Sequence, residues 1–249
     1  MKLIPVIDLM RGHVVRAVRG NRAAYQPVVS QLCASSEPLA VARALCDHCA
    51  TRQLYVADLD ALLGKPVQVA VLRSLLQALP ELELWLDAGF ASAPAATSLR
   101  AELGAAGQQV VPVFGSESLA SRAELERCFV GANAGADATA SAIVSAPVNG
   151  GVLSLDRRDG QRLDAAGCWD APALWPQRVI VMTLERVGSD AGPDLETLAE
   201  VRRKSPRTFI VGAGGIRNEG DLACAREAGA GAWLVASALH DGRLARVQA

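Results

Sequence analysis

The chain has 249 residues, of which 51% are hydrophobic and 20% are charged, and its formal net charge is −1. This balance supports a sizeable folded core and excludes a mainly disordered protein. The near-neutral charge, without blocks of like sign, gives no electrostatic surface for nucleic acid, and no apolar run approaches the ~20 residues of a membrane span. We therefore expect one globular domain, residues 1–249, whose partner is a small molecule.

Short apolar, β-branched runs alternate with amphipathic segments along the chain, which is typical of successive βα units. We expect strands at residues 3–8, 53–58, 82–87, 109–114, 151–156, 178–183, 207–212 and 232–236. We expect helices at residues 37–49, 66–79, 93–103, 118–129, 193–204 and 219–228. Eight such units in ~250 residues predict a single (β/α)8 TIM barrel.

The fifth unit departs from this pattern in two ways. Residues 170–177 contain two prolines and leave room for little more than one helical turn, so the fifth helix should be truncated. An uncovered barrel wall at that point would favour a homodimer. Residues 131–150 are rich in Ala, Gly and Ser and exceed an ordinary connection in length, which predicts a flap or a short extra helix.

The two halves of the chain echo each other strand by strand. The first and fifth strands both end in an aspartate, at Asp8 and Asp156, and each aspartate is followed four residues later by a glycine. Similar matches link the second strand with the sixth, the third with the seventh and the fourth with the eighth. Four matches in the same order indicate an internal half-barrel repeat, which places Asp8 and Asp156 on opposite sides of one mouth.

Three strand-end residues are candidates for catalysis, because the carboxyl ends of barrel strands form the face that carries active sites. A shared, partly dry mouth can separate the pKa values of Asp8 and Asp156, so that they act as general acid and base. A helix cap or an ion pair with Arg11 is the structural alternative for Asp8. Thr183 ends the sixth strand, where its hydroxyl could hold a substrate oxygen or orient a carboxylate. The alternative is a β-branched side chain that simply finishes the strand.

A glycine-rich turn after the seventh strand predicts phosphate binding. Gly214 and Gly215 precede a helix, where exposed amides can close on a phosphate, although a purely structural turn would also need glycines. Ser237 follows the eighth strand, and phosphate sites between the last two units are common in this fold. Gly115 and Ser116, the counterparts of the Ser237 segment in the half-repeat, complete the predicted phosphate-binding set.

Three further residues at the ends of the second and third strands are assigned to the substrate pocket: Asp58, Asp87 and Gly89. A capping interaction is the alternative for Asp58. The three histidines lack ligand or triad spacing, so surface or capping roles are expected, and we predict no metal site and no cofactor.

The six cysteines are scattered, and the chain starts without a signal-peptide pattern, which predicts a cytoplasmic protein with reduced thiols. Cys46 and Cys49 form a C-x-x-C pair, but they lie on an amphipathic pattern and no second Cys/His pair follows. They are therefore interpreted as small thiols that face the core.

These motifs resemble a known family, the barrel enzymes of histidine biosynthesis, ProFAR isomerase and its cyclase sibling. The resemblance covers nearly the whole chain. Its most specific stretches are Ile4-Pro5-Val6-Ile7-Asp8, Asp58-Leu59-Asp60-Ala61, Ser154-Leu155-Asp156-x-Arg158-Asp159-Gly160 and Gly214-Gly215-Ile216. It implies an Amadori rearrangement of an aminoaldose phosphate without cofactor. It also implies that Asp8 is the base at the second carbon of the sugar, that Asp156 is the acid that assists ring opening, and that Thr183 supports the substrate.

The sequence departs from the family at the third strand. The family's substrate carries two phosphates, and that strand normally ends in a glycine run that grips one of them, whereas here it ends in Asp87-Ala88-Gly89-Phe90. A carboxylate ~4 Å from a phosphate would repel it by roughly 4 kcal/mol at an effective dielectric near 20. The chain is more similar to divergent relatives that accompany tetrahydromethanopterin-linked one-carbon metabolism.

Three functions follow as hypotheses. The first is a cofactor-independent aldose–ketose isomerase, or an enzyme of related chemistry, acting on a small phosphorylated, sugar-like metabolite. The second is a catalytically retired barrel that binds such a metabolite as a sensor or as a subunit of a complex, and an exposed apolar patch at the missing helix would favour it. The third is the isomerisation of histidine biosynthesis itself.

Overall fold

The computed structural model describes residues 1–17, 25–129 and 151–247. Eight parallel strands form a closed barrel, because β11 pairs with β1 as well as with β10. In order around the barrel they are β1 (Lys2–Met10), β4 (Gln53–Asp58), β5 (Glu83–Asp87), β6 (Val110–Gly115), β7 (Val152–Arg158), β9 (Arg178–Thr183), β10 (Phe209–Ala213) and β11 (Ala232–Val235). This confirms the predicted (β/α)8 barrel.

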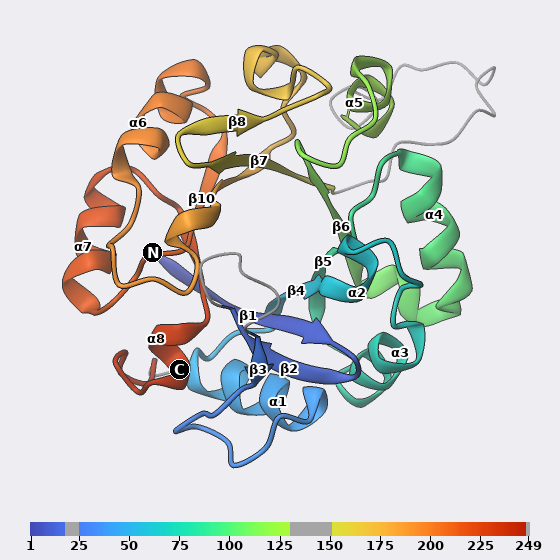
Figure 1. Cartoon of the computed structure of the whole chain (residues 1–249), viewed down its shortest axis with the longest axis vertical. Coiled ribbons are helices and arrows are strands. Elements are labelled where there is room, and N and C mark those ends of the chain that lie inside the picture. Colours follow the sequence, from blue (N-terminus) through green and yellow to red (C-terminus); the bar gives the residue numbers. More distant parts are fainter. Residues whose placement is uncertain (18–24, 130–150, 248–249) are drawn as a thin grey trace.

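Helices surround the barrel as an outer layer (Figure 1). They are α1 (Pro38–His48), α3 (Val69–Ala78), α4 (Ala93–Glu102), α5 (Arg122–Phe129), α6 (Leu195–Lys204), α7 (Glu219–Glu227) and the short α8 (Ser237–His240), while the short α2 (Leu59–Leu62) follows β4. The expected helices at 66–79 and 118–129 begin later than predicted, at Val69 and Arg122. No described helix is long and apolar enough to cross a membrane.

Alternation along the strands divides the core into two layers. Outward-facing residues such as Ile7, Val56 and Leu86 pack under the helices. Inward-facing residues such as Tyr55 and Trp85 fill the barrel. Because the interior is filled with side chains, a substrate can enter only from an end of the barrel.

Polar contacts close the amino end of the barrel. The Arg178 guanidinium donates to the Glu83 carboxylate (2.7 Å) and lies over the Trp85 ring. The Glu83 carboxylate also accepts from the Trp85 indole N–H (2.6 Å) and the Gln53 amide (3.2 Å). The open end is therefore the one formed by the carboxyl ends of the strands.

Two β-hairpins extend strands of the barrel, and neither was expected. β1 continues into β2 (His13–Arg16), and β7 continues into β8 (Gln161–Leu163). The connecting pairs Arg11-Gly12 and Asp159-Gly160 all have positive φ, from 50° to 81°, which is the geometry of a two-residue type I′ turn. The same device in both halves supports the predicted half-repeat. A further strand, β3 (Gln26–Pro27), pairs with β2.

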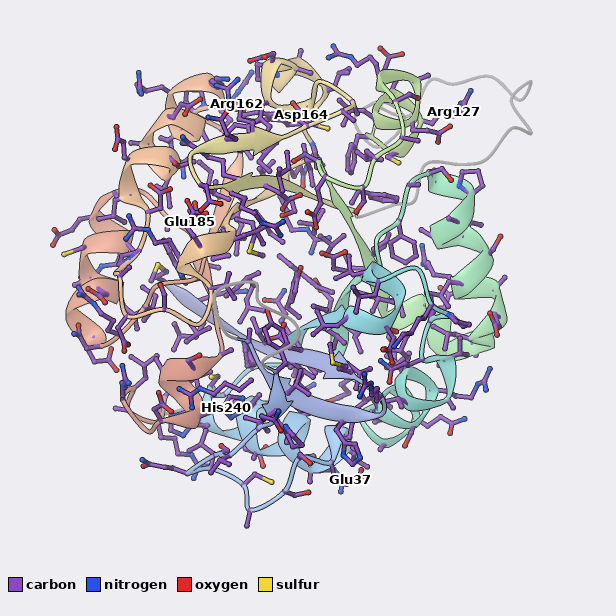
Figure 2. The ribbon with its side chains drawn as sticks, viewed as in Figure 1. Glu37, Arg127, Arg162, Asp164, Glu185 and His240 are labelled. Carbon is purple, nitrogen blue, oxygen red and sulfur yellow. The ribbon has the colours of Figure 1, made fainter. Side chains whose placement is uncertain are left out.

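Two short 3-10 turns replace the fifth helix, η3 (Cys168–Asp170) and η4 (Pro172–Leu174), as the truncation predicted. Asp164 accepts hydrogen bonds from the amides of Cys168 and Trp169 (2.7 and 2.9 Å), which fixes η3. The buried Trp169 ring lies under the Arg162 guanidinium, and Figure 2 shows Arg162 and Asp164 on this wall. Trp175 is buried here as well.

The wall at the missing helix is thus covered by the chain itself. The large exposed hydrophobic side chains of the described residues lie on other segments: Met1, Val29, Leu63, Phe209 and Val247. Among the described residues, no exposed apolar patch of the kind that would have favoured a retired barrel lies at this wall. The homodimer stays a prediction, but an uncovered wall no longer supports it. The enlarged segment 131–150 lies outside the described residues.

Candidate active site

A cavity opens at the carboxyl ends of the barrel strands, and three aspartates line it. Asp8, Asp87 and Asp156 come from β1, β5 and β7, and each belongs to the inward-facing set of its strand. Asp8 lies opposite Val15 in the first hairpin, and Asp156 lies opposite Leu163 in the second. The two predicted catalytic aspartates therefore occupy equivalent places in the two halves and face one cavity.

Asp156 is held from several sides. Its side chain is 95% buried, with 5% relative exposure, and its Oδ1 accepts from the Ser154 hydroxyl at 2.6 Å. Its Oδ2 accepts from the Glu117 amide at 3.2 Å. A Cβ atom at Gly115 would come within 3.0 Å of Oδ2, so the glycine leaves room for the carboxyl group. These contacts fix the orientation of Asp156 toward the cavity.

Burial raises the pKa of Asp156 to about 8. The hydrogen bond from Ser154 opposes this shift, while the negative charges of Glu117 and Asp87 add to it. Desolvation of a carboxylate in a dry pocket is a recognised way to keep an acid protonated at neutral pH. Asp156 can therefore donate a proton near pH 7.

Asp8 has a different environment. It is only half-buried, it lines the cavity, and it lies beside Ala57 of β4 in the parallel register. The alternative of a helix cap does not apply, because the segment after Asp8 continues into the β-hairpin. Asp8 and Asp156 therefore line the same cavity but differ in burial: Asp8 is half-buried, whereas Asp156 is buried and holds its proton near neutral pH.

The predicted phosphate turn follows β10 and lines the cavity. Gly214 and Gly215 both have positive φ, near 79°, and their amides donate to no other residue in the described part of the chain. A Cβ atom on Gly215 would lie 2.1 Å from the Gly192 carbonyl oxygen. Packing alone thus requires glycine at 215, and the turn also leaves amides available for a ligand. Ser237 begins α8 on the same side of the cavity.

Two ion-paired arginines rim this side of the cavity, and sequence reasoning did not assign them. Arg16 makes two hydrogen bonds to the Asp241 carboxylate (2.7 and 2.8 Å), and Arg243 contacts Asp190 at 2.7 Å and Asp241 at 3.2 Å. All four side chains line the cavity. The guanidinium of Arg16 holds the pKa of Asp241 below its usual range. The arginine charges are largely compensated by these carboxylates.

Gly115 and Ser116 do not join the phosphate turn. Ser116 is fully buried behind Asp156: its hydroxyl donates to the Leu163 carbonyl (2.7 Å) and accepts from the Asp156 amide (2.9 Å). Neither residue lines the cavity. The structure therefore does not support the phosphate-binding role predicted for them, because Ser116 is buried away from the cavity. The two residues position Asp156.

Asp58 and Thr183 are counterparts in the half-repeat, and both face outward from the barrel. The Asp58 carboxylate accepts from the Gln68 amide (2.7 Å) and from the Ala61 amide (3.2 Å), which caps α2. The Thr183 hydroxyl donates to the carboxylate of Asp194, the N-cap of α6, at 2.8 Å. Neither lines the cavity. The pocket role of Asp58 and the direct substrate contact of Thr183 are therefore not supported, because strand alternation points both side chains into the helical layer.

Tyr55 is a site residue that the sequence reasoning missed. It is 3% exposed, lines the cavity, and its hydroxyl donates to the Asp87 carboxylate at 3.0 Å. Burial and the charge of Asp87 raise its pKa well above the ordinary value, with smaller contributions from Asp156 and Asp8. Tyr55 therefore remains a hydrogen-bond donor among the three aspartates. Its place two residues before Ala57, on the inner face of β4, is the signal that could have found it.

The remaining polar groups do not form a second centre. Among the described residues, no group of three or more His, Cys, Asp or Glu side chains is arranged to hold a metal ion. Cys46 and Cys49 are buried, and burial raises their pKa values to about 11 and about 12, so their thiols are unreactive core residues as expected. His240 is buried rather than at the surface, and its Nδ1 lies 3.0 Å from the Ser30 hydroxyl. Gly89, which the sequence assigned to the substrate pocket, follows β5 but does not line the cavity, so the structure does not support that assignment.

Comparison with known proteins decides the family. A family model described as histidine biosynthesis protein matches residues 2–245. The chain belongs to this family. The match covers the whole barrel, including both hairpins and the turns after β10 and β11. It confirms the resemblance drawn from the strand-end motifs.

Relatives within the family are distant but full-length. An uncharacterised protein of Methanocaldococcus jannaschii is 27% identical over 98% of this chain and 95% of its own. Proteins of Thermomicrobium roseum and Cenarchaeum symbiosum are 28% and 25% identical, over 98% of this chain and 94% and 97% of their own. These two are named as imidazole-4-carboxamide isomerases, and that name contains two 5-phosphoribosyl groups. The chain is accordingly an isomerase-like enzyme of the histidine biosynthesis family.

Proposed function

We propose that the chain is a cofactor-independent acid–base enzyme that isomerises a phosphorylated, sugar-like metabolite by an aldose–ketose rearrangement. One observation carries the proposal: the buried Asp156, with a pKa of about 8, faces the half-buried Asp8 across one cavity. Two carboxyl groups with environments this unlike suit an acid and a base that work on the same substrate.

The proposed chemistry moves protons within one molecule. Asp156 holds its proton at neutral pH and donates it to the ring oxygen of the sugar, which opens the ring. Asp8 then takes the proton from the second carbon, and the neighbouring carbon is reprotonated to give the ketose form. No electrons leave the substrate, because the oxidation of one carbon is balanced by the reduction of its neighbour.

The proposed phosphate site lies at the turns after β10 and β11. The amides of Gly214 and Gly215 and the start of α8 at Ser237 line the same cavity as the aspartates. The loops after the last two strands, together with a short extra helix, are the usual phosphate site of this fold. A phosphate bound there would place the carbon chain of the substrate between Asp8 and Asp156.

The test is solvent deuterium exchange. The wild-type protein is incubated in D2O with a panel of aldose and aldosylamine phosphates, and NMR detects deuterium at the second carbon of the recovered aldose and at the first carbon of the ketose. We expect exchange with at least one member, and a loss of at least ~10²-fold in Asp8→Asn and in Asp156→Asn. Both variants should bind inorganic phosphate as the wild type does. Full exchange in both variants would contradict the assignment.

The reaction named for the isomerase relatives is a second candidate, favoured by their match over nearly the whole chain. It is tested by asking whether the gene restores growth to a histidine auxotroph that lacks this step. Phosphate binding without exchange for any panel member would instead support a retired, ligand-binding barrel. The link to one-carbon metabolism stays a prediction.

A further inference from the structure

Two neighbouring arginines in the second hairpin point in opposite directions. Arg157 faces the helical layer, where its guanidinium donates to the Thr197 hydroxyl at 2.7 Å and to the Gly160 carbonyl at 2.9 Å. Arg158 lies on the same face of β7 as Asp156 and lines the cavity. Arg157 therefore ties the hairpin to α6 and closes its turn, whereas Arg158 places its charge at the mouth of the barrel.

Arg158 differs from the other cations of this cavity. Three arginines line it among the described residues, and two of them, Arg16 and Arg243, are paired with carboxylates. The exposed side chain of Arg158 has no hydrogen-bond or ion-pair partner in the described part of the chain. Arg158 is therefore the cavity cation that is available to a ligand.

The acidic groups beside Arg158 leave its charge uncompensated. Asp156 precedes it by two residues on the same face of the strand and holds its proton near neutral pH, because burial raises the pKa of this carboxyl group to about 8. Glu117 follows β6 and also lines the cavity, but no ion pair joins these two described residues, Glu117 and Arg158. A ligand that displaces solvent from Arg158 must supply the counter-charge, since burying an unpaired charge is unfavourable.

The first hairpin carries no charge at the matching position. Met10 pairs with His13 next to the turn of the β1–β2 hairpin, as Arg158 pairs with Gln161 next to the turn of the β7–β8 hairpin. The Met10 side chain packs against the apolar residues inside the barrel. Because the same hairpin forms with a methionine, the fold does not require an arginine at this place.

We propose that Arg158 binds a second anionic group of the substrate, a carboxylate or a phosphate, while the turns after β10 and β11 bind the first phosphate. The inference rests on the proposed function, which supplies that first phosphate site. The guanidinium fork matches either group, because both present two oxygens to a pair of parallel N–H donors. Since Arg158 lies two residues from Asp156 on one strand face, the second anion would hold the sugar against the acid.

Three derivatives of one six-carbon chain test the second site without knowledge of the natural substrate. Glucitol 6-phosphate ends in a hydroxymethyl group at its first carbon, 6-phosphogluconate ends there in a carboxylate, and glucitol 1,6-bisphosphate ends there in a second phosphate. Dissociation constants are measured by calorimetry at pH 7, with inorganic phosphate as the reference. We expect the wild type to bind the carboxylate or the bisphosphate at least roughly tenfold more tightly than glucitol 6-phosphate. The compound that gains identifies the second anion.

Variants of the two adjacent arginines assign the preference. Arg158→Gln should abolish it and leave the binding of glucitol 6-phosphate within about twofold of wild type. Arg158→Lys keeps the charge but loses the fork, so it should retain only part of the preference. Arg157→Gln is the matched control, because it removes the same charge from a side chain that faces the helical layer, and it should keep the preference.

The outcomes separate this inference from the proposed function. Equal binding of the three compounds by the wild type would overturn the inference and leave the phosphate site intact. A preference that survives Arg158→Gln, or that Arg157→Gln lowers equally, would overturn the role of Arg158. If neither inorganic phosphate nor glucitol 6-phosphate binds the wild type, both proposals fail. The wild-type comparison tests the second site even if a variant does not fold.

Discussion

The two halves of this barrel share one plan and differ at the residues that face the substrate. Each half begins with a strand that carries an aspartate two residues before its end and continues into a hairpin with a two-residue turn. Each half also ends its second strand with a polar side chain that ties the barrel to the helical layer, Asp58 in one and Thr183 in the other. Both halves therefore share the features that build the barrel.

The difference lies in what surrounds each aspartate and each loop amide. Asp156 is buried and neutral, whereas Asp8 is half-buried. The β10 turn offers amides to the cavity, whereas the β5 turn satisfies its amide with the carboxylate of Asp87. A symmetric scaffold thus carries an asymmetric site, and an asymmetric site can hold an acid opposite a base.

The largest expected effect concerns the buried aspartate. Asp156 has a folded-state pKa of about 8, raised above its ordinary value of 3.8, so the unfolded chain binds fewer protons between these values and stability falls as pH rises. This one group should cost up to about 4 kcal/mol between pH 5 and pH 8. Asp156→Asn mimics the neutral acid and should remove most of that slope in denaturant unfolding.

Asp8→Asn is the matched variant from the other half for the same measurement. Because Asp8 is half-buried, we expect this variant to keep most of the wild-type slope between pH 5 and pH 8. An equal flattening in both variants would mean that the two halves are electrostatically alike, and the acid would then lose its assignment.

The second expected effect compares the glycines of the two loops. A Cβ atom on Gly215 would approach the backbone of Gly192 to 2.1 Å, while a Cβ atom on Gly89 would meet the flexible end of Leu62 at 3.3 Å. Both glycines have positive φ. We expect Gly215→Ala to lower the free energy of unfolding by about 3 kcal/mol or more and Gly89→Ala by about 1 kcal/mol. Similar losses would show that the β10 turn moves to accept a side chain.

Sequence patterns predicted most of this architecture for a physical reason. Apolar runs of strand length and aspartates at strand ends report directly on burial and on the open face, which is why the eight strands and the inward-facing Asp8, Asp87 and Asp156 were predicted. The hairpin at Asp159-Gly160 was missed although an Asp-Gly pair is a strong turn signal. It was overlooked because the barrel pattern assigns a helix, not a strand, to that place.

The direction of strand-end side chains could not be read from the same patterns. Buried parallel strands are apolar on both faces, so nothing in the composition distinguishes inward from outward positions. Asp58 and Thr183 therefore looked like Asp8 and Asp156, although a shift of one residue points them into the helical layer. Tyr55 was missed because an aromatic residue in the middle of a strand is typical of the hydrophobic core and gives no sign that its hydroxyl faces a cavity.

The smallest expected effect tests the outward-facing pair. Asp58→Asn weakens the hydrogen bonds to the amides of Ala61 and Gln68, and Thr183→Val removes the hydroxyl bound to Asp194. Each change should lower the free energy of unfolding by about 1–2 kcal/mol, since a cap or a buried hydrogen bond contributes that much. Deuterium exchange on the best panel substrate should stay within a few-fold of wild type in both. If Thr183→Val instead lost exchange as Asp156→Asn does, while remaining folded, Thr183 would act on the substrate after all, and the two halves would differ at their second strands as well.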